Sequence, residues 1–199
     1  MSARQRSFSQ FTLADALAAA GIADFEDWSL EAAPRPPSAH FAERMRRLEA
    51  FDTERSEGAK LLLVDTFLEE AIQPYKKLRV FKESPLKAPV ASGVIDYLVT
   101  RRAAVPLTPL LCVAEAKKDD FDAGLAQCLV EMQAAAQTNE TDGRRIDIYG
   151  IVTNGATWQF CRRQTTGEVA RSDAYVASDA PKLLGVLDYL FARCEENIG

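Results

Sequence analysis

The feature that most constrains this fold is an apolar run that ends in alternating charges. Five apolar residues at 110–114 are followed by Glu115 and Lys117. Because no polar residue interrupts the run, it predicts a strand that is covered on both faces. Side chains two residues apart on a strand share a face, so Glu115 and Lys117 would emerge together on the face that Leu111 and Val113 hold in the core. Charged groups are costly there unless they serve a function or have a partner.

Length and composition predict one globular core. The chain has 199 residues, of which 47% are hydrophobic and 27% are charged, and this is enough to bury one sizeable core. No apolar run approaches the roughly 20 residues of a membrane helix, and the first residues lead into no signal-peptide core, so we expect a cytoplasmic protein without a membrane partner. The cysteines at 112, 128, 161 and 194 are not closely spaced, which indicates reduced core thiols and no zinc or disulfide framework.

The charge balance bears on nucleic-acid binding. A formal net charge of −5 argues against binding nucleic acid through bulk charge alone. The segment 57–117 carries nine basic and seven acidic residues, and it is the only third of the chain with a net positive charge.

The first fifty residues differ from the rest. The segment 11–20 is rich in helix formers and ends at Gly21, a favourable C-cap. Three prolines within 31–38 predict a linker or extended arm. We therefore expect an N-terminal helical appendage with a proline-rich arm at 1–50, and a main domain at 51–199.

The appendage also bears on assembly. A helix as short as 11–20 is unstable alone and must bury Phe11, Leu13 and Leu17. The arm could lay it on its own core as a lid or on a second copy of the chain. We favour a homodimer, because two-fold pairing is the commonest closed assembly.

A second helix, capped by Asp52 or Thr53 and running to residue 72, carries an acid on its apolar side. On a helical wheel, Glu57 lies on the same side as an apolar stripe, and Glu54 is the alternative candidate for the inward-facing acid. The members of that stripe are Leu61, Val64, Leu68 and Ala71. Acids at a helix N-terminus are also favourable without any catalytic role.

Two predicted strands bring an aspartate close to Glu115. Segments 78–83 and 93–100 are both β-prone, and a turn with two prolines lies between them. Asp96 lies at the centre of the second strand, where aspartate is disfavoured. The connection at 101–109 is short enough for a hairpin, so Asp96 would lie beside the strand that carries Glu115.

The rest of the chain completes an α/β order. A helix at 121–137, with Asp119 or Asp120 as N-cap, carries Gln127 on a side that is otherwise small and apolar. A strand at 146–153, the turn Asn154-Gly155 and a strand at 157–162 form a hairpin. A short strand within 168–176 and a helix at 181–194 follow. The order of helix, three strands, helix and two strands predicts a mixed central sheet flanked by helices.

Carboxylates that converge at one point favour a hard cation. Mg²⁺ takes oxygen ligands and keeps waters for the substrate, and Mn²⁺ can substitute for it. A lysine beside the cation can orient a water or stabilise phosphate charge. Asp96, Glu115 and Lys117 therefore indicate phosphodiester hydrolysis.

These pieces resemble the restriction-endonuclease-like, or PD-(D/E)XK, nuclease superfamily, over roughly residues 54–162. The matching pieces are Gly93-Val94-Ile95-Asp96, Glu115-Ala116-Lys117, Gln127 and Glu57. The resemblance implies that Asp96 and Glu115 hold the metal, that Lys117 positions the attacking water, and that Glu57 completes the metal's shell through water. Ile95 stands where the name-giving proline would be. The segment 150–158 is similar to a hairpin in relatives of the N-terminal nuclease domain of type I restriction subunits.

The resemblance implies a restriction-endonuclease-like core that acts as a Mg²⁺-dependent endonuclease on DNA, and we expect it to carry the N-terminal helical appendage. The alternative is a catalytically silent nucleic-acid-binding or assembly module of the same fold. A structural pairing of Glu115 with Lys117 is the third interpretation. His40 is the only histidine, which leaves little material for a Ser-His-Asp site, and Trp158 is interpreted as a core residue, with base stacking as the alternative.

Overall fold

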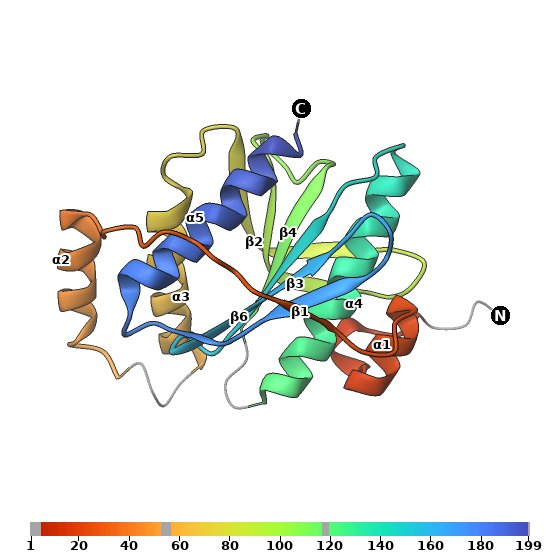
Figure 1. Ribbon diagram of the computed structural model, residues 1–199, viewed down its shortest axis with the longest axis horizontal. Helices are drawn as coiled ribbons and strands as arrows, with labels where there is room; N and C mark the ends of the chain where they lie inside the picture. Colours follow the sequence, from red (N-terminus) through yellow and green to blue (C-terminus); the bar gives the residue numbers. More distant parts are fainter. Residues whose placement is uncertain (1–4, 53–56, 117–119, 199) are drawn as a thin grey trace.

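The fold has three layers, with a central β-sheet between two layers of helices (Figure 1). The computed structural model describes residues 5–52, 57–116 and 120–198. The helices are η1 (Phe8–Gln10), α1 (Leu13–Ala20), α2 (Ala39–Leu48), α3 (Glu57–Ile72), α4 (Phe121–Thr141) and α5 (Ala180–Glu196). The strands are β1 (Glu26–Trp28), β2 (Leu78–Lys87), β3 (Ser92–Arg101), β4 (Leu110–Ala116), β5 (Ile148–Thr153), β6 (Thr157–Arg163), β7 (Val169–Ser172) and β8 (Tyr175–Val176).

The sheet is mixed, as the sequence predicts. Its order is β1-β7-β6-β5-β4-β3-β2, and β8 pairs with β6 off this path. The pairs β4 with β5 and β1 with β7 are parallel, while the other pairs are antiparallel. The parallel step from β4 to β5 is made by α4, which crosses one face of the sheet. An α/β class with a mixed sheet flanked by helices is therefore confirmed.

Each face of the sheet buries its own apolar cluster. Helices α2, α3 and α5 cover one face, where Phe67, Trp158 and Phe191 are fully buried. Helices α1 and α4 cover the other face, where Leu125 and Leu129 are among the buried residues. Because β4 lies in the middle of the sheet, all seven of its residues are buried, which explains its uninterrupted apolar sequence.

Several local signals fix the ends of these elements. Asp120 is the N-cap of α4, and its Oδ1 accepts a hydrogen bond of 2.9 Å from the Ala123 N–H. Gly21 ends α1 in the left-handed conformation at φ 74°. At the turn between β5 and β6, Gly155 has φ 87°, and the Asn154 side chain accepts hydrogen bonds from two backbone N–H groups. These three boundaries agree with the prediction.

Other boundaries differ from the prediction for tertiary reasons. Strand β2 continues to Lys87 through Pro85, which is tolerated because β2 is an edge strand of the sheet. Helix α4 continues to Thr141, and Asn139 near its end hydrogen-bonds with the Leu110 backbone. Strand β1 was not predicted. Its three residues have little apolar character of their own and form a strand by pairing with β7.

The N-terminal segment packs on its own chain. Helix α1 lies on α4, where Ala16 is fully buried, and Phe8 of η1 is buried against β3 and α4. Strand β1 adds an edge strand to the central sheet. The residues predicted as an appendage therefore share a core with the main domain. The homodimer stays a prediction.

The proline-rich arm crosses the molecule from β1 towards α2 (Figure 1). The Arg35 N–H donates to the Pro181 carbonyl at the start of α5. The Arg35 guanidinium donates to the carbonyls of Glu70 and Ala71 at the C-terminus of α3 and pairs with Asp188 of α5 at 3.0 Å. Because a cation stabilises the last carbonyls of a helix, Arg35 ties the arm to both helices.

The burial of the cysteines agrees with the prediction of core thiols. All four cysteines are free thiols and are buried. Within the described residues, none of the helices combines the length and the apolar character needed to cross a membrane.

Candidate active site on β3 and β4

The register of the sheet brings Asp96 next to Glu115. The last regular pair between β3 and β4 is Tyr97 opposite Ala114. The two strands are antiparallel, so the next residues along them are Asp96 and Glu115. The Asp96 Oδ2 accepts a hydrogen bond of 3.0 Å from the Ala116 N–H. Two acidic residues that are 19 residues apart in the sequence are thus neighbours in the fold.

Glu115 belongs to the side of the sheet that α4 covers. Val113, two residues earlier on β4, packs in the α4 cluster, and Gln127 of α4 bonds to the Glu115 side chain. On β3, Ile95 and Leu98 both pack in that cluster, so the regular alternation is interrupted next to Asp96. Leu111 does not share this side, contrary to the prediction. It packs in the α3 and α5 cluster together with its neighbour Cys112, because the register shifts by one residue between Val99 and Thr100.

The Glu115 side chain is held by an amide of α4. Glu115 is fully buried, and its Oε2 accepts a hydrogen bond of 2.8 Å from Gln127 Nε2. The same nitrogen donates to Oε1 of Glu131 at 2.9 Å. Gln127, which the sequence places on an otherwise apolar side of this helix, thus bonds to Glu115.

Glu131 belongs to this cluster, and the sequence reasoning missed it. It is one helical turn after Gln127 and is fully buried. A signal existed, because residues four apart on a helix share a side and Gln127 had already been placed on a buried side. Glutamate on a helix normally faces solvent, and for this reason Glu131 was not predicted to be buried.

The orientation of the Gln127 amide follows from its partners. Its NH₂ group donates to both glutamates, whose carboxyl oxygens accept. Its Oε1 then points the other way. This oxygen is buried and accepts no hydrogen bond from the part of the chain that the structure describes.

Three other predicted residues cannot be placed. Lys117 and the alternative acid Glu54 lie outside the described residues. Glu57 begins α3, but its side chain is outside the description as well. The described part of the site therefore consists of Asp96, Glu115, Gln127 and Glu131.

The donor set fits a hard divalent cation. In the described ranges, no three His, Cys, Asp or Glu side chains form a ready-made metal site. Mg²⁺ does not need such a cage, because it commonly uses one or two carboxylates together with waters and substrate phosphates. Asp96 and Glu115 supply those carboxylates.

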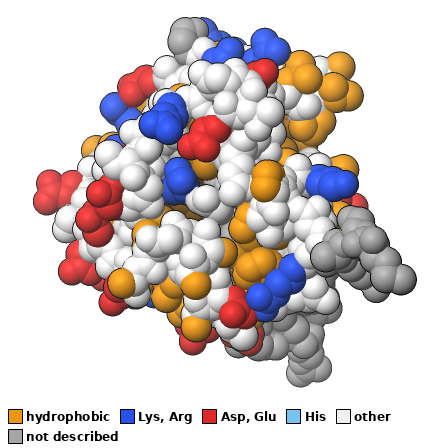
Figure 2. Space-filling view, turned by 90° about the vertical axis from the view of Figure 1, so that its right-hand side faces the viewer, with side chains coloured by type: hydrophobic (Ala, Val, Ile, Leu, Met, Phe, Trp, Pro, Cys, Tyr) orange, Lys and Arg blue, Asp and Glu red, His pale blue; other side chains and the backbone are white. Residues whose placement is uncertain are grey.

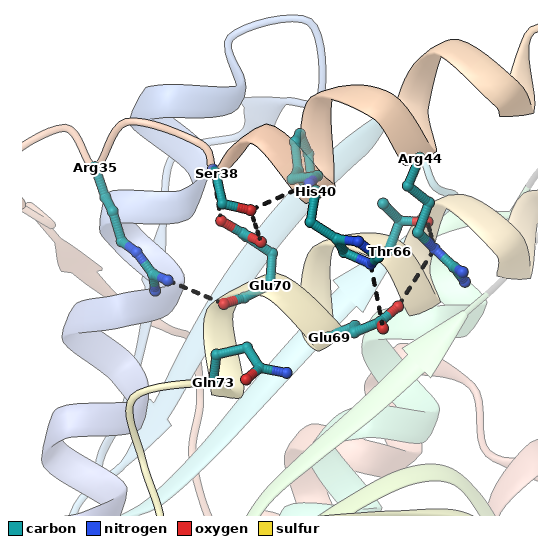
Figure 3. A pocket seen from close by; sticks show the side chains of 9 residues that line it. Arg35, Ser38, His40, Arg44, Thr66, Glu69, Glu70 and Gln73 are labelled. Atoms are coloured by element: carbon teal, nitrogen blue, oxygen red, sulfur yellow. Dashed lines mark hydrogen bonds and ion pairs between the residues drawn. The ribbon is translucent and has the colours of Figure 1, made fainter.

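A separate pocket lies away from Asp96 and Glu115 and contains the only histidine of the chain. It measures about 380 Å³ and lies between α2 and α3, on the face of the sheet opposite α4 (Figure 3). His40 faces Glu69, with Nε2 at 3.9 Å from Oε1. The hydroxyl of Ser38 donates to Glu70 at 2.8 Å and accepts from the Phe41 N–H at 3.1 Å. Because this hydroxyl caps α2 and is not bonded to His40, the pocket does not form a Ser-His-acid site.

Arg44, which also lines this pocket, makes contacts that hold helices together. Arg44 donates to Thr66 at 2.9 Å and pairs with Glu69 at 3.3 Å. Together with Arg35 and Ser38, it fastens the arm and α2 to α3 (Figure 3). The pocket is thus lined by contacts that hold elements together.

The surface over α1 and α4 shows no continuous basic patch among its described residues. In Figure 2, Lys and Arg side chains lie at separate places, with apolar and acidic side chains between them. Trp158 is fully buried and donates from Nε1 to the Gly155 carbonyl, so it is a core residue and the base-stacking alternative is wrong. Arg162 pairs with Asp147 at 2.6 Å.

Comparison with known proteins adds no relative to this picture. No protein-family model matches the chain, and no curated protein matches it.

Proposed function

We propose that this chain is a metal-dependent nuclease of the restriction-endonuclease-like, PD-(D/E)XK, superfamily that hydrolyses phosphodiester bonds in DNA. The single observation that carries the proposal is that Asp96, in the middle of β3, lies beside Glu115, near the end of β4, with Gln127 bonded to Glu115. The order α3, β2, β3, β4, α4, β5, β6 supports it, because the resemblance in sequence covers the same elements.

The roles follow from the chemistry of the donor groups. Asp96 and Glu115 would hold Mg²⁺ or Mn²⁺, and Glu57 is the proposed third acid. A bound ion of this kind lowers the pKa of a water and stabilises negative charge on the phosphate. The Ala116 N–H holds Asp96 and the Gln127 amide holds Glu115, so both carboxylates are oriented before any ligand arrives. Lys117 is the proposed group that orients the water and contacts the phosphate.

Calorimetric titration with Mn²⁺ tests the metal site. The wild-type chain should bind Mn²⁺, and Asp96→Asn should abolish binding, because it replaces one of two ionised ligands by a neutral amide. Asp27→Asn is the matched control, since Asp27 is an exposed residue of β1, at the opposite edge of the sheet from β2 and β3. Equal Mn²⁺ binding by the wild type and Asp96→Asn would refute the site.

A cleavage assay tests the reaction. With Mg²⁺ and a duplex DNA, the wild type should cut. Lys117→Ala should not cut, yet it should bind Mn²⁺ as the wild type does, because an ammonium group is not a ligand of the metal. Cutting by Lys117→Ala at the wild-type rate would contradict this role. A wild type that binds DNA and Mn²⁺ without cutting would instead be the silent binding module.

A further inference from the structure

The amide of Gln127 links two carboxylates inside the protein. Its Nε2 donates to Glu115 at 2.8 Å and to Glu131 at 2.9 Å. Both glutamates are fully buried, and Gln127 is 5% exposed. The three side chains come from two elements, since Glu115 ends β4 while Gln127 and Glu131 follow each other by one turn on α4.

The geometry of an amide makes these two bonds dependent on each other. A primary amide has two N–H hydrogens in one plane, about 120° apart. When Glu131 accepts one hydrogen, the rotation of the Gln127 amide is fixed, and the other hydrogen points at Glu115. Since the cluster is sealed from bulk water, solvent cannot easily take the place of Glu131.

We infer that Glu131 is a positioning residue for the active site, acting through Gln127 to orient the carboxylate of Glu115. The inference rests on the proposed function, because it treats Glu115 as a metal ligand. Groups that hold a metal ligand from behind commonly change metal affinity by about 10- to 100-fold when they are removed. A purely structural role would not require a carboxylate here, since buried ionic groups can often be replaced by apolar ones without loss of stability.

A double-mutant cycle read by Mn²⁺ calorimetry tests this inference. Glu131→Met keeps the length of the side chain and removes its acceptor, so Mn²⁺ affinity should fall by about 10- to 100-fold. Gln127→Met should cause a fall of similar size. In the Gln127→Met background, Glu131→Met should have an effect below about twofold, because a group that acts only through Gln127 has nothing left to position.

Two further variants separate positioning from general damage. Met132→Leu is the matched control, because Met132 is a fully buried neighbour on α4 that packs at Gly150 of β5; it should leave Mn²⁺ affinity unchanged. Glu131→Gln keeps both the size and an acceptor, so its loss should be smaller than that of Glu131→Met. If Glu131→Met fails to fold, Glu131→Gln takes its place in the double-mutant cycle. Its effect on Mn²⁺ affinity should likewise vanish in the Gln127→Met background.

The outcomes distinguish the two proposals. A wild type that binds no Mn²⁺ refutes the metal site and this inference with it. If the wild type binds Mn²⁺ and Asp96→Asn does not, the metal site stands. Wild-type affinity in Glu131→Met then overturns the positioning role alone. The positioning role is also overturned if Glu131→Met, or Glu131→Gln, lowers Mn²⁺ affinity equally in the wild-type and the Gln127→Met backgrounds. Glu131 would then act without Gln127.

Discussion

Replacing Gly185 by alanine should destabilise the protein, although glycine is unfavourable within a helix. Gly185 lies in α5, where the proline-rich arm crosses it. A Cβ at this position would lie 2.2 Å from the Ala33 carbonyl oxygen, 3.0 Å from the Ala33 carbonyl carbon and 3.2 Å from the Pro34 Cα. Ordinary carbon contacts begin near 3.5 Å, so the arm or the helix must move by roughly 1 Å.

The size of the effect follows from two opposing contributions. In an unobstructed helix, changing glycine to alanine stabilises by about 1 kcal/mol. Overpacking a close contact costs about 1–3 kcal/mol. The upper half of that range applies here, because Arg35 resists displacement of the arm through its bonds to Pro181, Glu70 and Asp188. The net loss should be about 1–2 kcal/mol, or a fall in Tm of about 2–8 °C for a chain of this length.

Urea and thermal unfolding measure this effect, and a second glycine provides the control. Gly58 is also helical, in α3, but a Cβ there would meet nothing within 4 Å. Gly58→Ala should therefore raise the free energy of unfolding by up to about 1 kcal/mol. The two substitutions are chemically identical and should have opposite signs. If Gly185→Ala stabilises as much as Gly58→Ala, then the arm does not lie against α5.

Three further predictions concern buried groups and charge. Asn139→Ala removes both side-chain bonds to the Leu110 backbone, each 2.8 Å, and should cost about 2–4 kcal/mol of unfolding free energy in urea; a loss below about 0.5 kcal/mol would contradict it. Hydrogen bonds from Arg46 and Arg47 lower the pKa of Glu43 from 4.5 to about 2. Its contribution to stability is therefore complete above pH 4.5 and is lost as the pH falls towards 2, and an NMR titration midpoint near 4.5 would refute this. Burial raises the pKa of Cys161 to about 12 and that of the other thiols well above the usual range, so a thiol reagent at mildly alkaline pH should label the four cysteines only after denaturation; rapid labelling of the native protein would be the contrary result.

The parts of the fold that the sequence predicted are those fixed by short-range physics. The uninterrupted apolar run became β4, which is buried throughout. Asn154 and Gly155 made their turn, because only a few residue types tolerate its backbone angles. Strand β1 could not be found in this way, since it exists only through its pairing with β7. Pro85 was wrongly taken to end β2, because whether a strand is an edge strand depends on the whole sheet.

The residues of the candidate site were also predicted only in part. Gln127 was found because a polar residue on an apolar side of a helix is conspicuous. Glu131 was not, although it is on the same side one turn later. Helix α4 is buried around most of its circumference, between the sheet and α1, so a helical wheel has no solvent side against which to judge an acid. The contact with Gln127 shows which way Glu131 points.

The meeting of Asp96 with Glu115 depends on a single extra residue in β4. At the start of that strand, Thr100 is opposite Leu110, so an unbroken ladder would pair Asp96 with Ala114. Glu115 would then be opposite Ile95, and the two carboxylates would point to opposite faces of the sheet. The register shift between Val99 and Thr100 adds one residue to β4, after which Tyr97 is opposite Ala114. Hydrophobic pattern alone cannot reveal this shift, because every residue at 110–114 is apolar and suits either face. The chemistry proposed here is therefore a consequence of that β-bulge as much as of the two acids.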